Sequence, residues 1–140
     1  MKIETGFQIE TPAEFIPWDI SEPKLIELLG KSDLRRVTNG YYTIPCTTLG
    51  GLLLQLGFHF EPRHDGKLKE LEFFREKPMD LGESFREFQA HLESLFGDPP
   101  KQTDGTAGFP TFKWIQADCE IFHYVFDRFG PEEHVGIRKY

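Results

Sequence analysis

The histidine and carboxylate side chains of this chain are its strongest candidates for a catalytic or metal-binding site. The chain has five histidines and 23 acidic residues, and both kinds of group bind metals and transfer protons. His59 and His123 hold comparable places in two similar stretches of sequence, one residue apart in register. If both stretches are strands, each histidine points away from its aromatic neighbours. We therefore expect the two to lie on one sheet face. If that face is uncovered, they and nearby aromatic side chains would form a shallow small-molecule or metal site.

The spacing of these groups argues against a preformed metal centre. No two histidines are arranged as H-x-x-x-H or H-E-x-x-H, the spacings that bring two imidazoles together on one helix face. Glu132 and Glu133 are adjacent, and adjacent strand residues point in opposite directions, so no shared acid–base pair is expected. The sequence thus predicts no bound metal and no cofactor. The alternative to a shared site is that His59 and His123 simply occupy half-exposed strand positions and have no binding role.

Nucleophile and phosphate-binding motifs are incomplete. Cys46 and Cys119 lie far apart with no second cysteine near either, which favours burial over a disulfide, a metal site or a catalytic thiol. Ser84 stands at an expected helix start, and the glycines complete neither a G-x-G-x-x-G nor a P-loop pattern. We therefore expect a protein that is not an enzyme. A small hydrolase-like enzyme with a site around His59 and His123 is the alternative.

An excess of aromatic residues, with 14 Phe, 4 Tyr and 2 Trp, is the second feature that suggests binding. Exposed aromatic side chains anchor protein partners or line clefts, whereas a thick core or a homodimer interface would hide them. Alternation is expected to group Phe112, Trp114, Phe122, Tyr124 and Phe126 on one sheet face, opposite Ile115, Ile121, His123 and Val125. The candidate partner- or ligand-binding residues are His59, Phe112, Trp114, Phe122, His123, Tyr124, Phe129, Glu132 and Glu133.

The charge of the chain limits its partners. The formal net charge is −7, and more of the negative charge falls in the second half, so binding to nucleic-acid phosphates is disfavoured. No apolar run is long enough to cross a bilayer, and the first residues lack the basic-then-apolar pattern of a signal peptide. We therefore expect a cytoplasmic protein with a protein partner or with self-association, and with no nucleic-acid or membrane partner.

Two helices are predicted. In 84–96, apolar residues recur at helical spacing, Ser84 and Glu87 match a capping box, and Gly97 supplies a stop. A shorter helix is predicted at 23–29, introduced by Ser21 and ended by Gly30.

Strand patterns follow each predicted helix. After the first helix they occupy 41–44, 51–60 and 68–74, with a turn at Arg63-His64-Asp65-Gly66. After the second helix comes a polar loop at 98–108, and then strands at 112–116, 119–126 and 134–140. Both helix ends and hairpins repeat at nearly the same spacing, which suggests a duplicated helix–strand–strand–strand unit.

The predicted architecture is a single α+β domain over residues 1–140. It has a mostly antiparallel sheet of six or seven strands with two helices on one face and a pseudo-twofold repeat of an α-β-β-β unit. Residues 1–20 are expected to be an arm that adds an edge strand, 21–77 the first half and 78–140 the second.

This layout resembles that of small tandem-module inhibitor or immunity proteins, although no sequence motif carries the resemblance. It implies a concave sheet face that binds a partner protein. The expected function is therefore a non-enzymatic binding protein that engages or neutralises a partner. A small-molecule or metal-binding domain around His59 and His123 and a structural homodimerising module are the alternatives.

Overall fold

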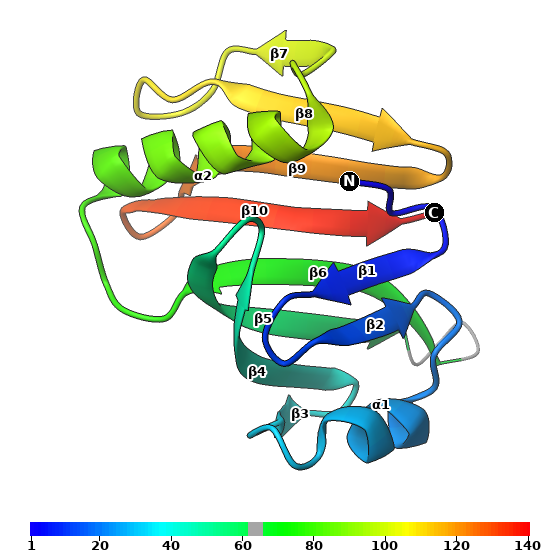
Figure 1. The fold of residues 1–140 in the computed structure, drawn as a ribbon. Coiled ribbons are helices and arrows are strands. Elements are labelled where there is room, and N and C mark those ends of the chain that lie inside the picture. The colour runs from blue at the N-terminus through cyan, green and yellow to red at the C-terminus, as the bar shows by residue number, and fades with distance from the viewer. Residues whose placement is uncertain (62–65) are drawn as a thin grey trace.

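A computed structural model describes residues 1–61 and 66–140 (Figure 1). In these residues the chain forms two helices and ten strands. Their bounds in chain order are β1 (Gly6–Ile9), β2 (Glu14–Pro17), α1 (Glu22–Leu29), β3 (Arg35–Thr38), β4 (Tyr41–Thr48), β5 (Leu52–Glu61), β6 (Lys67–Arg75), α2 (Leu81–Phe96), β7 (Lys101–Thr103), β8 (Thr111–Gln116), β9 (Cys119–Asp127) and β10 (Pro131–Lys139). The predicted turn at 63–66 lies, apart from Gly66, outside the described residues.

Eight of these strands form one antiparallel sheet in the order β3-β4-β5-β6-β10-β9-β8-β7. The order is symmetric about β6 and β10, which pair through Glu70–Glu72 and Gly136–Arg138. The predicted α+β class and antiparallel sheet are confirmed. The predicted number of strands was too low, because the edge strands β3 and β7 are short, polar and without clear alternation. Each half thus has four strands after its helix, and a common origin of the halves stays a prediction.

The N-terminal arm does not add an edge strand to this sheet, so that prediction was wrong. Instead β1 and β2 pair with each other as a separate two-stranded sheet. A single bridge between Thr11 and Thr47 ties this hairpin to β4. The hairpin lies over the β4–β6 side of the large sheet (Figure 1), where Phe7, Ile9 and Ile16 are fully buried. Apolar burial against the sheet therefore decides its position.

Helix α2 begins one turn earlier than predicted. Asp80 is its N-cap and accepts a hydrogen bond from the Glu83 backbone N–H at 3.0 Å, so Ser84 lies inside the helix and is not a cap. The end at Gly97, which has a φ of 81°, agrees with the prediction. Helix α1 starts after its N-cap Ser21, as predicted within one residue. Neither of these helices in the described chain is long and apolar enough to cross a membrane.

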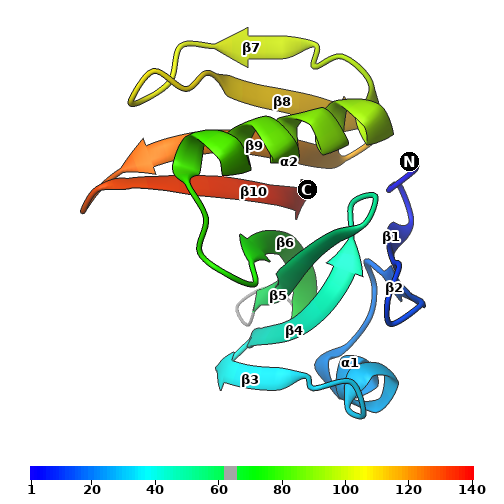
Figure 2. The same ribbon diagram turned by 60° about the vertical axis from the view of Figure 1, so that its left-hand side comes forward.

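The core lies on one face of the large sheet, between the sheet and a layer made of α1, α2 and the β1–β2 hairpin (Figure 2). The predicted alternation of β5 is confirmed, since its even-numbered residues from Leu52 to Phe60 are buried. Buried side chains from both halves belong to one apolar cluster. Half of the aromatic residues are buried members of this cluster.

Candidate functional site on the open sheet face

The other face of the large sheet is left open. In residues 1–61 and 66–140, both helices and the β1–β2 hairpin lie on the core side, and no element covers the opposite side (Figure 2). An open face of an antiparallel sheet is normally polar. This one also carries large apolar and aromatic side chains that are wholly or partly exposed. They are Tyr41, Leu53, Phe74, Ile115, Tyr124 and Phe126.

A ladder of five side chains crosses the middle of the open face. Strand register places them side by side on five neighbouring strands, from β4 to β9. In order they are Tyr41, His59, Glu70, Arg138 and Glu120. Because directly opposed residues point to the same side of a sheet, we refer to these five residues as the central ladder.

Arg138 connects the two halves of the sheet within the central ladder. Its Nε donates a hydrogen bond to Glu70 Oε1 at 2.9 Å, and its Nη1 lies 3.6 Å from Glu120 Oε1. Its guanidinium also lies over the Phe122 ring, 4.9 Å from the centroid. Glu120 is shared with Lys113 on β8 at 3.9 Å. Arg138 and Lys113 are therefore both already paired with carboxylates of the open face.

The other end of the central ladder is aromatic and acidic. The rings of Tyr41 and His59 are stacked, with centroids 4.2 Å apart, and His59 Nε2 contacts a carboxylate oxygen of Glu72. Burial, and then the negative charge of Glu72, raise the pKa of the Tyr41 hydroxyl above its ordinary value. Burial also raises the pKa of Tyr124, with further increases from Glu70 and Glu72 against the opposing effect of Arg138. The charge of Glu72 thus acts on both tyrosines, in addition to the larger effect of burial.

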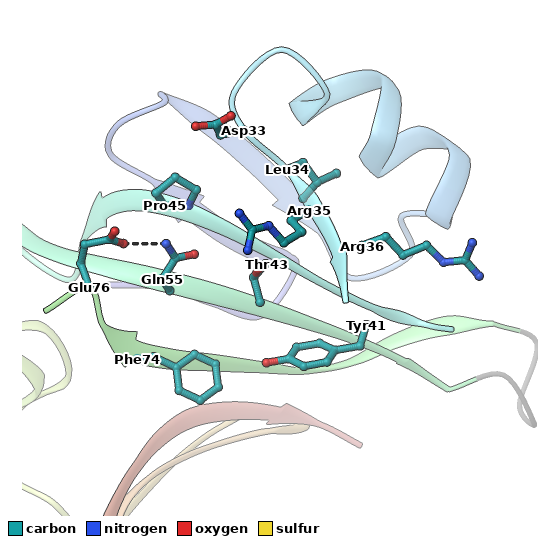
Figure 3. Close-up of a pocket in the computed structure, with 10 residues that line it drawn as sticks. All are labelled: Asp33, Leu34, Arg35, Arg36, Tyr41, Thr43, Pro45, Gln55, Phe74 and Glu76. Atoms are coloured by element: carbon teal, nitrogen blue, oxygen red, sulfur yellow. Dashed lines mark hydrogen bonds between the residues drawn. The ribbon is translucent and has the colours of Figure 1, made fainter. Parts of the chain in front are cut away.

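Beside the central ladder lies a hollow of about 840 Å³ over β3, β4, β5 and β6. Figure 3 shows the Arg35 side chain over the strands, with Tyr41 and Phe74 along one side and Arg36 turned away. Gln55 Nε2 donates to Glu76 Oε2 at 2.6 Å at one end of this hollow. A glycine makes room there, because a Cβ at Gly57 would lie 3.0 Å from Tyr41 Cε1 and 3.2 Å from Phe74 Cε2.

The predicted meeting of His59 and His123 is wrong, because the two histidines lie on opposite faces of the sheet. His59 is opposite Glu70, which is opposite Arg138, which is opposite Glu120, so all four share the open face. His123 is three residues from Glu120 on β9 and therefore points to the other face. There it is fully buried under α2, with its ring stacked on Phe85 at 3.9 Å.

His123 belongs to a buried polar network instead of a surface site. Its Nε2 lies 2.6 Å from Glu133 Oε2, and its Nδ1 lies 2.8 Å from Gln89 Oε1. Since Gln89 donates its own amide N–H to Glu93, both ring nitrogens of His123 face acceptors. Gln89 and Glu133 thus hold the imidazole from both of its ring nitrogens. The contact with Glu133 is buried beneath α2.

The same network fastens α2 to both halves of the sheet. Ser84 donates its hydroxyl hydrogen to Glu133 and accepts a hydrogen bond from Arg75 Nε at 2.8 Å. Arg75 also pairs with Glu87 and lies over the Phe88 ring, 4.1 Å from its centroid. Ser84 donates to the carboxylate and does not contact the imidazole, so the three side chains lack the order of a catalytic triad.

The other predicted binding residues divide between core and surface. Phe112 and Trp114 are buried in the core, and Trp114 Nε1 donates to the Gly97 carbonyl at 2.7 Å. Phe122 is also buried, but it lies on the open face beneath the guanidinium of Arg138. The predicted grouping of β8 and β9 side chains was wrong, because Phe112 pairs with His123 and Trp114 with Ile121 on the covered face.

Four further candidates lie at or near the surface of the second half. Tyr124 is half-buried on the open face, and its ring stacks on that of His134 with 5.0 Å between centroids. Phe129, at the tip of the β9–β10 hairpin, is 87% exposed. Glu132 is exposed beside Phe126, while Glu133 turns inward to the buried network. The β9–β10 hairpin therefore extends the open face with two exposed phenylalanines.

Both cysteines are buried and free. Burial is the main cause that raises the pKa of the Cys46 thiol to about 12, and the charges of Glu10 and Glu76 add to it. Burial likewise raises the pKa of Cys119. A thiol with a raised pKa is a poor nucleophile at neutral pH. Neither cysteine is set up for catalysis.

Comparisons with known proteins give no identification, because no protein family, curated protein or solved structure matches this chain.

Sequence reasoning missed four of the five residues of the central ladder, namely Tyr41, Glu70, Arg138 and Glu120, and it also missed Glu72. A signal for two of them was present. In the strand predicted at 68–74, Glu70 and Glu72 alternate with Leu71 and Phe73, which places both carboxylates on the face away from the core. Their proximity to His59 depends on the register between β5 and β6, which the sequence does not display.

Proposed function

We propose that this chain is a non-enzymatic binding protein whose open sheet face holds a protein partner, with the partner contributing apolar and basic side chains. The observation that carries the proposal is the uncovered face itself. It presents Tyr41, Phe74, Tyr124 and Phe126 between charged groups. Aromatic anchors within a polar rim are typical of surfaces that bind proteins.

The width of this face supports a protein partner over a small molecule. Small-molecule sites enclose most of their ligand, whereas the hollow beside the central ladder opens to solvent and is lined mainly by polar groups. The exposed apolar side chains span the sheet from Leu53 on β5 to Ile115 on β8. A partner with a surface of comparable width would cover them together.

The charge of the face supports a partner with basic side chains. Arg138 and Lys113 are already paired with Glu70 and Glu120. Three other carboxylates of this face, those of Glu61, Glu72 and Glu132, have no Lys or Arg partner in the described part of the chain. Lys or Arg side chains from a partner would neutralise them and accelerate encounter at low salt.

A second candidate function is binding of a small anionic ligand in the hollow. The observation that favours it is Arg35, whose guanidinium lies over the hollow of Figure 3 and has no ion-pair partner in residues 1–61 and 66–140. The hydroxyl groups of Tyr41 and Thr43 line the same hollow. A carboxylate or phosphate ligand would stabilise the protein thermally, and Arg35→Ala would abolish that stabilisation.

Affinity capture with matched baits tests the main proposal. The first bait is the wild type, the second carries Phe74→Ser and Phe126→Ser on the open face, and the third carries Phe15→Ser on the β1–β2 hairpin. Phe15 is a suitable control because its exposed fraction of 43% is close to the 37% of Phe74. We expect one stoichiometric partner with the first and third baits and its loss with the second.

Two results would contradict the proposal. The first is equal retention of the partner by all three baits, because the open face would then not be the binding surface. The second is capture of this chain alone together with a dimer in light scattering, since the face would then join two copies. A dimer formed instead by pairing of sheet edges is unfavourable, because the edge strands β3 and β7 are short and basic.

A further inference from the structure

Three possible metal ligands converge on the open face. One ring nitrogen of His59 and one carboxylate oxygen each of Glu70 and Glu72 lie within 4.8 Å of one another. Glu70 and Glu72 share a face by strand alternation on β6, and register places His59 opposite Glu70 on β5. We propose that His59, Glu70 and Glu72 bind a divalent transition-metal ion, for which Zn²⁺ is the best match.

The donor set selects the class of metal. Mg²⁺ and Ca²⁺ take oxygen ligands, whereas an imidazole nitrogen suits Zn²⁺, Cu²⁺, Ni²⁺ and Fe²⁺. Bonds of about 2.0–2.2 Å to one nitrogen and two carboxylate oxygens would place the donor atoms about 3.4 Å apart around a tetrahedral Zn²⁺. Side-chain rotations that separate His59 from Glu72 and bring Glu70 closer would give that spacing. The fourth position faces solvent above the sheet, where water or a group from a partner would occupy it.

An unsatisfied nitrogen points independently to a cation. His59 Nε2 is buried, and none of the described residues gives it a hydrogen bond. It lies against Glu72 Oε1 without the geometry of a hydrogen bond. In the tautomer that carries its hydrogen on Nδ1, the Nε2 lone pair faces the Glu72 carboxylate, and a cation between the two groups would remove this repulsion. A metal ion at this point would satisfy both residues at once.

The surroundings hold the ligands in place and leave donor oxygens available. Arg138 binds Glu70 through Oε1, so the second oxygen of that carboxylate remains for a metal. The stacked Tyr41 ring fixes the plane of the His59 imidazole, with only 13° between the two rings. Such supporting contacts orient metal ligands and raise their affinity.

His134 provides a matched control within the same face. Its side chain is 33% exposed, as is that of His59, and it too is stacked on a tyrosine, with 15° between the rings. Its nearest carboxylate is that of Glu132, at 3.8 Å. Within the described residues, His134 belongs to no cluster of three possible ligands. Loss of His134 should therefore leave metal binding intact.

The test is calorimetric titration of the purified chain with ZnCl₂ after removal of metals with a chelator. We expect one Zn²⁺ per chain in the wild type. His59→Gln and Glu72→Gln should each weaken binding by at least about tenfold, and His134→Gln should bind as the wild type does. Co²⁺ gives a second readout, because its visible absorption reports ligand geometry. A tetrahedral spectrum should form with the wild type and be lost with His59→Gln.

Any of three results would overturn the proposal. These are no saturable Zn²⁺ binding by the wild type, unchanged binding by both His59→Gln and Glu72→Gln, or an equal loss with His134→Gln. All four proteins are compared after thermal unfolding has shown that they fold equally well. The experiment needs no partner protein, so its outcome is separate from that of the proposed function.

Discussion

The aromatic rings of Tyr41 and His59 are stacked on the open sheet face, with 4.2 Å between centroids and 13° between planes. Glu72 contacts Nε2 of the same imidazole. This arrangement couples the ionisation of the tyrosine to the carboxylate. The pKa of Tyr41 can therefore be used to probe the electrostatic potential at this site.

The first prediction concerns the pKa of Tyr41. Glu72→Gln should lower this pKa, but not to the ordinary value, because burial is the larger cause of its increase. Phenolate absorbance measures it, as the difference between each protein and its Tyr41→Phe version. An unchanged or higher pKa in Glu72→Gln would contradict the assigned cause.

The same shift has a consequence for stability at alkaline pH. A pKa raised in the folded state means that the folded protein holds the proton more tightly than the unfolded chain does. The resulting stabilisation is complete below the ordinary tyrosine pKa and is lost as pH rises through the folded value. Tyr41→Phe should therefore lose less stability than the wild type when the pH is raised through this range.

The second prediction concerns the buried contact between His123 and Glu133. His123→Ala leaves the Glu133 carboxylate and the Gln89 amide oxygen without their partner, and such a loss costs about 1–3 kcal/mol. His134→Ala on the open face should change the free energy of unfolding by no more than about 0.5 kcal/mol. Urea unfolding of both variants measures the difference. Equal stability of the two would show that the network contributes little.

The third prediction compares two glycines on the open face. A Cβ at Gly136 would lie 2.4 Å from Phe122 Cζ and 2.6 Å from the Leu71 carbonyl oxygen, whereas at Gly57 the nearest atoms, at 3.0 Å or more, belong to side chains. Backbone at Leu71 cannot move aside without disturbing the β6–β10 pairing. Gly136→Ala should therefore destabilise by about 1–3 kcal/mol, and Gly57→Ala by less. The reverse order in thermal or urea unfolding would contradict this account.

The fourth prediction concerns the thiols. Because Cys46 and Cys119 are buried and burial raises the pKa of both, neither should react rapidly with a disulfide reagent in the folded protein at mildly alkaline pH. Both should react after denaturation. A fast-reacting thiol in the native protein would contradict the burial and reopen the question of a catalytic cysteine.

Local patterns in the sequence were sufficient to predict much of the fold. The alternating residues of β5 predicted its buried face, and the apolar stripe around Phe88 predicted α2. Ser84 was mistaken for a cap because Ser and Glu three residues apart match a capping box wherever they occur. Asp80 offers an equally good cap one turn earlier. Side-chain partners distant in sequence, such as Glu133, decide the role of Ser84.

The site was harder to predict because it depends on the register between strands. A two-residue turn at Ala117 and Asp118 pairs Gln116 with Cys119, and this register places Phe112 and His123 on the same face. The prediction that Phe112 and His123 lie on opposite faces assumed a different register between these two strands. A one-residue shift exchanges the two faces of a strand, so His123 was expected on the surface and lies in the core. Which face the helices cover is likewise a property of the assembled sheet.

Site-specific photo-crosslinking tests the central claim, that the open sheet face binds a protein partner, most directly. A photoreactive phenylalanine analogue is placed at Phe74, at Phe126 or, as a control, at Phe15, which is similarly exposed but lies on the β1–β2 hairpin. We predict that the same partner is crosslinked from Phe74 and Phe126 and not from Phe15, and that added salt reduces its yield. A partner crosslinked from Phe15 but from neither open-face position would contradict the account.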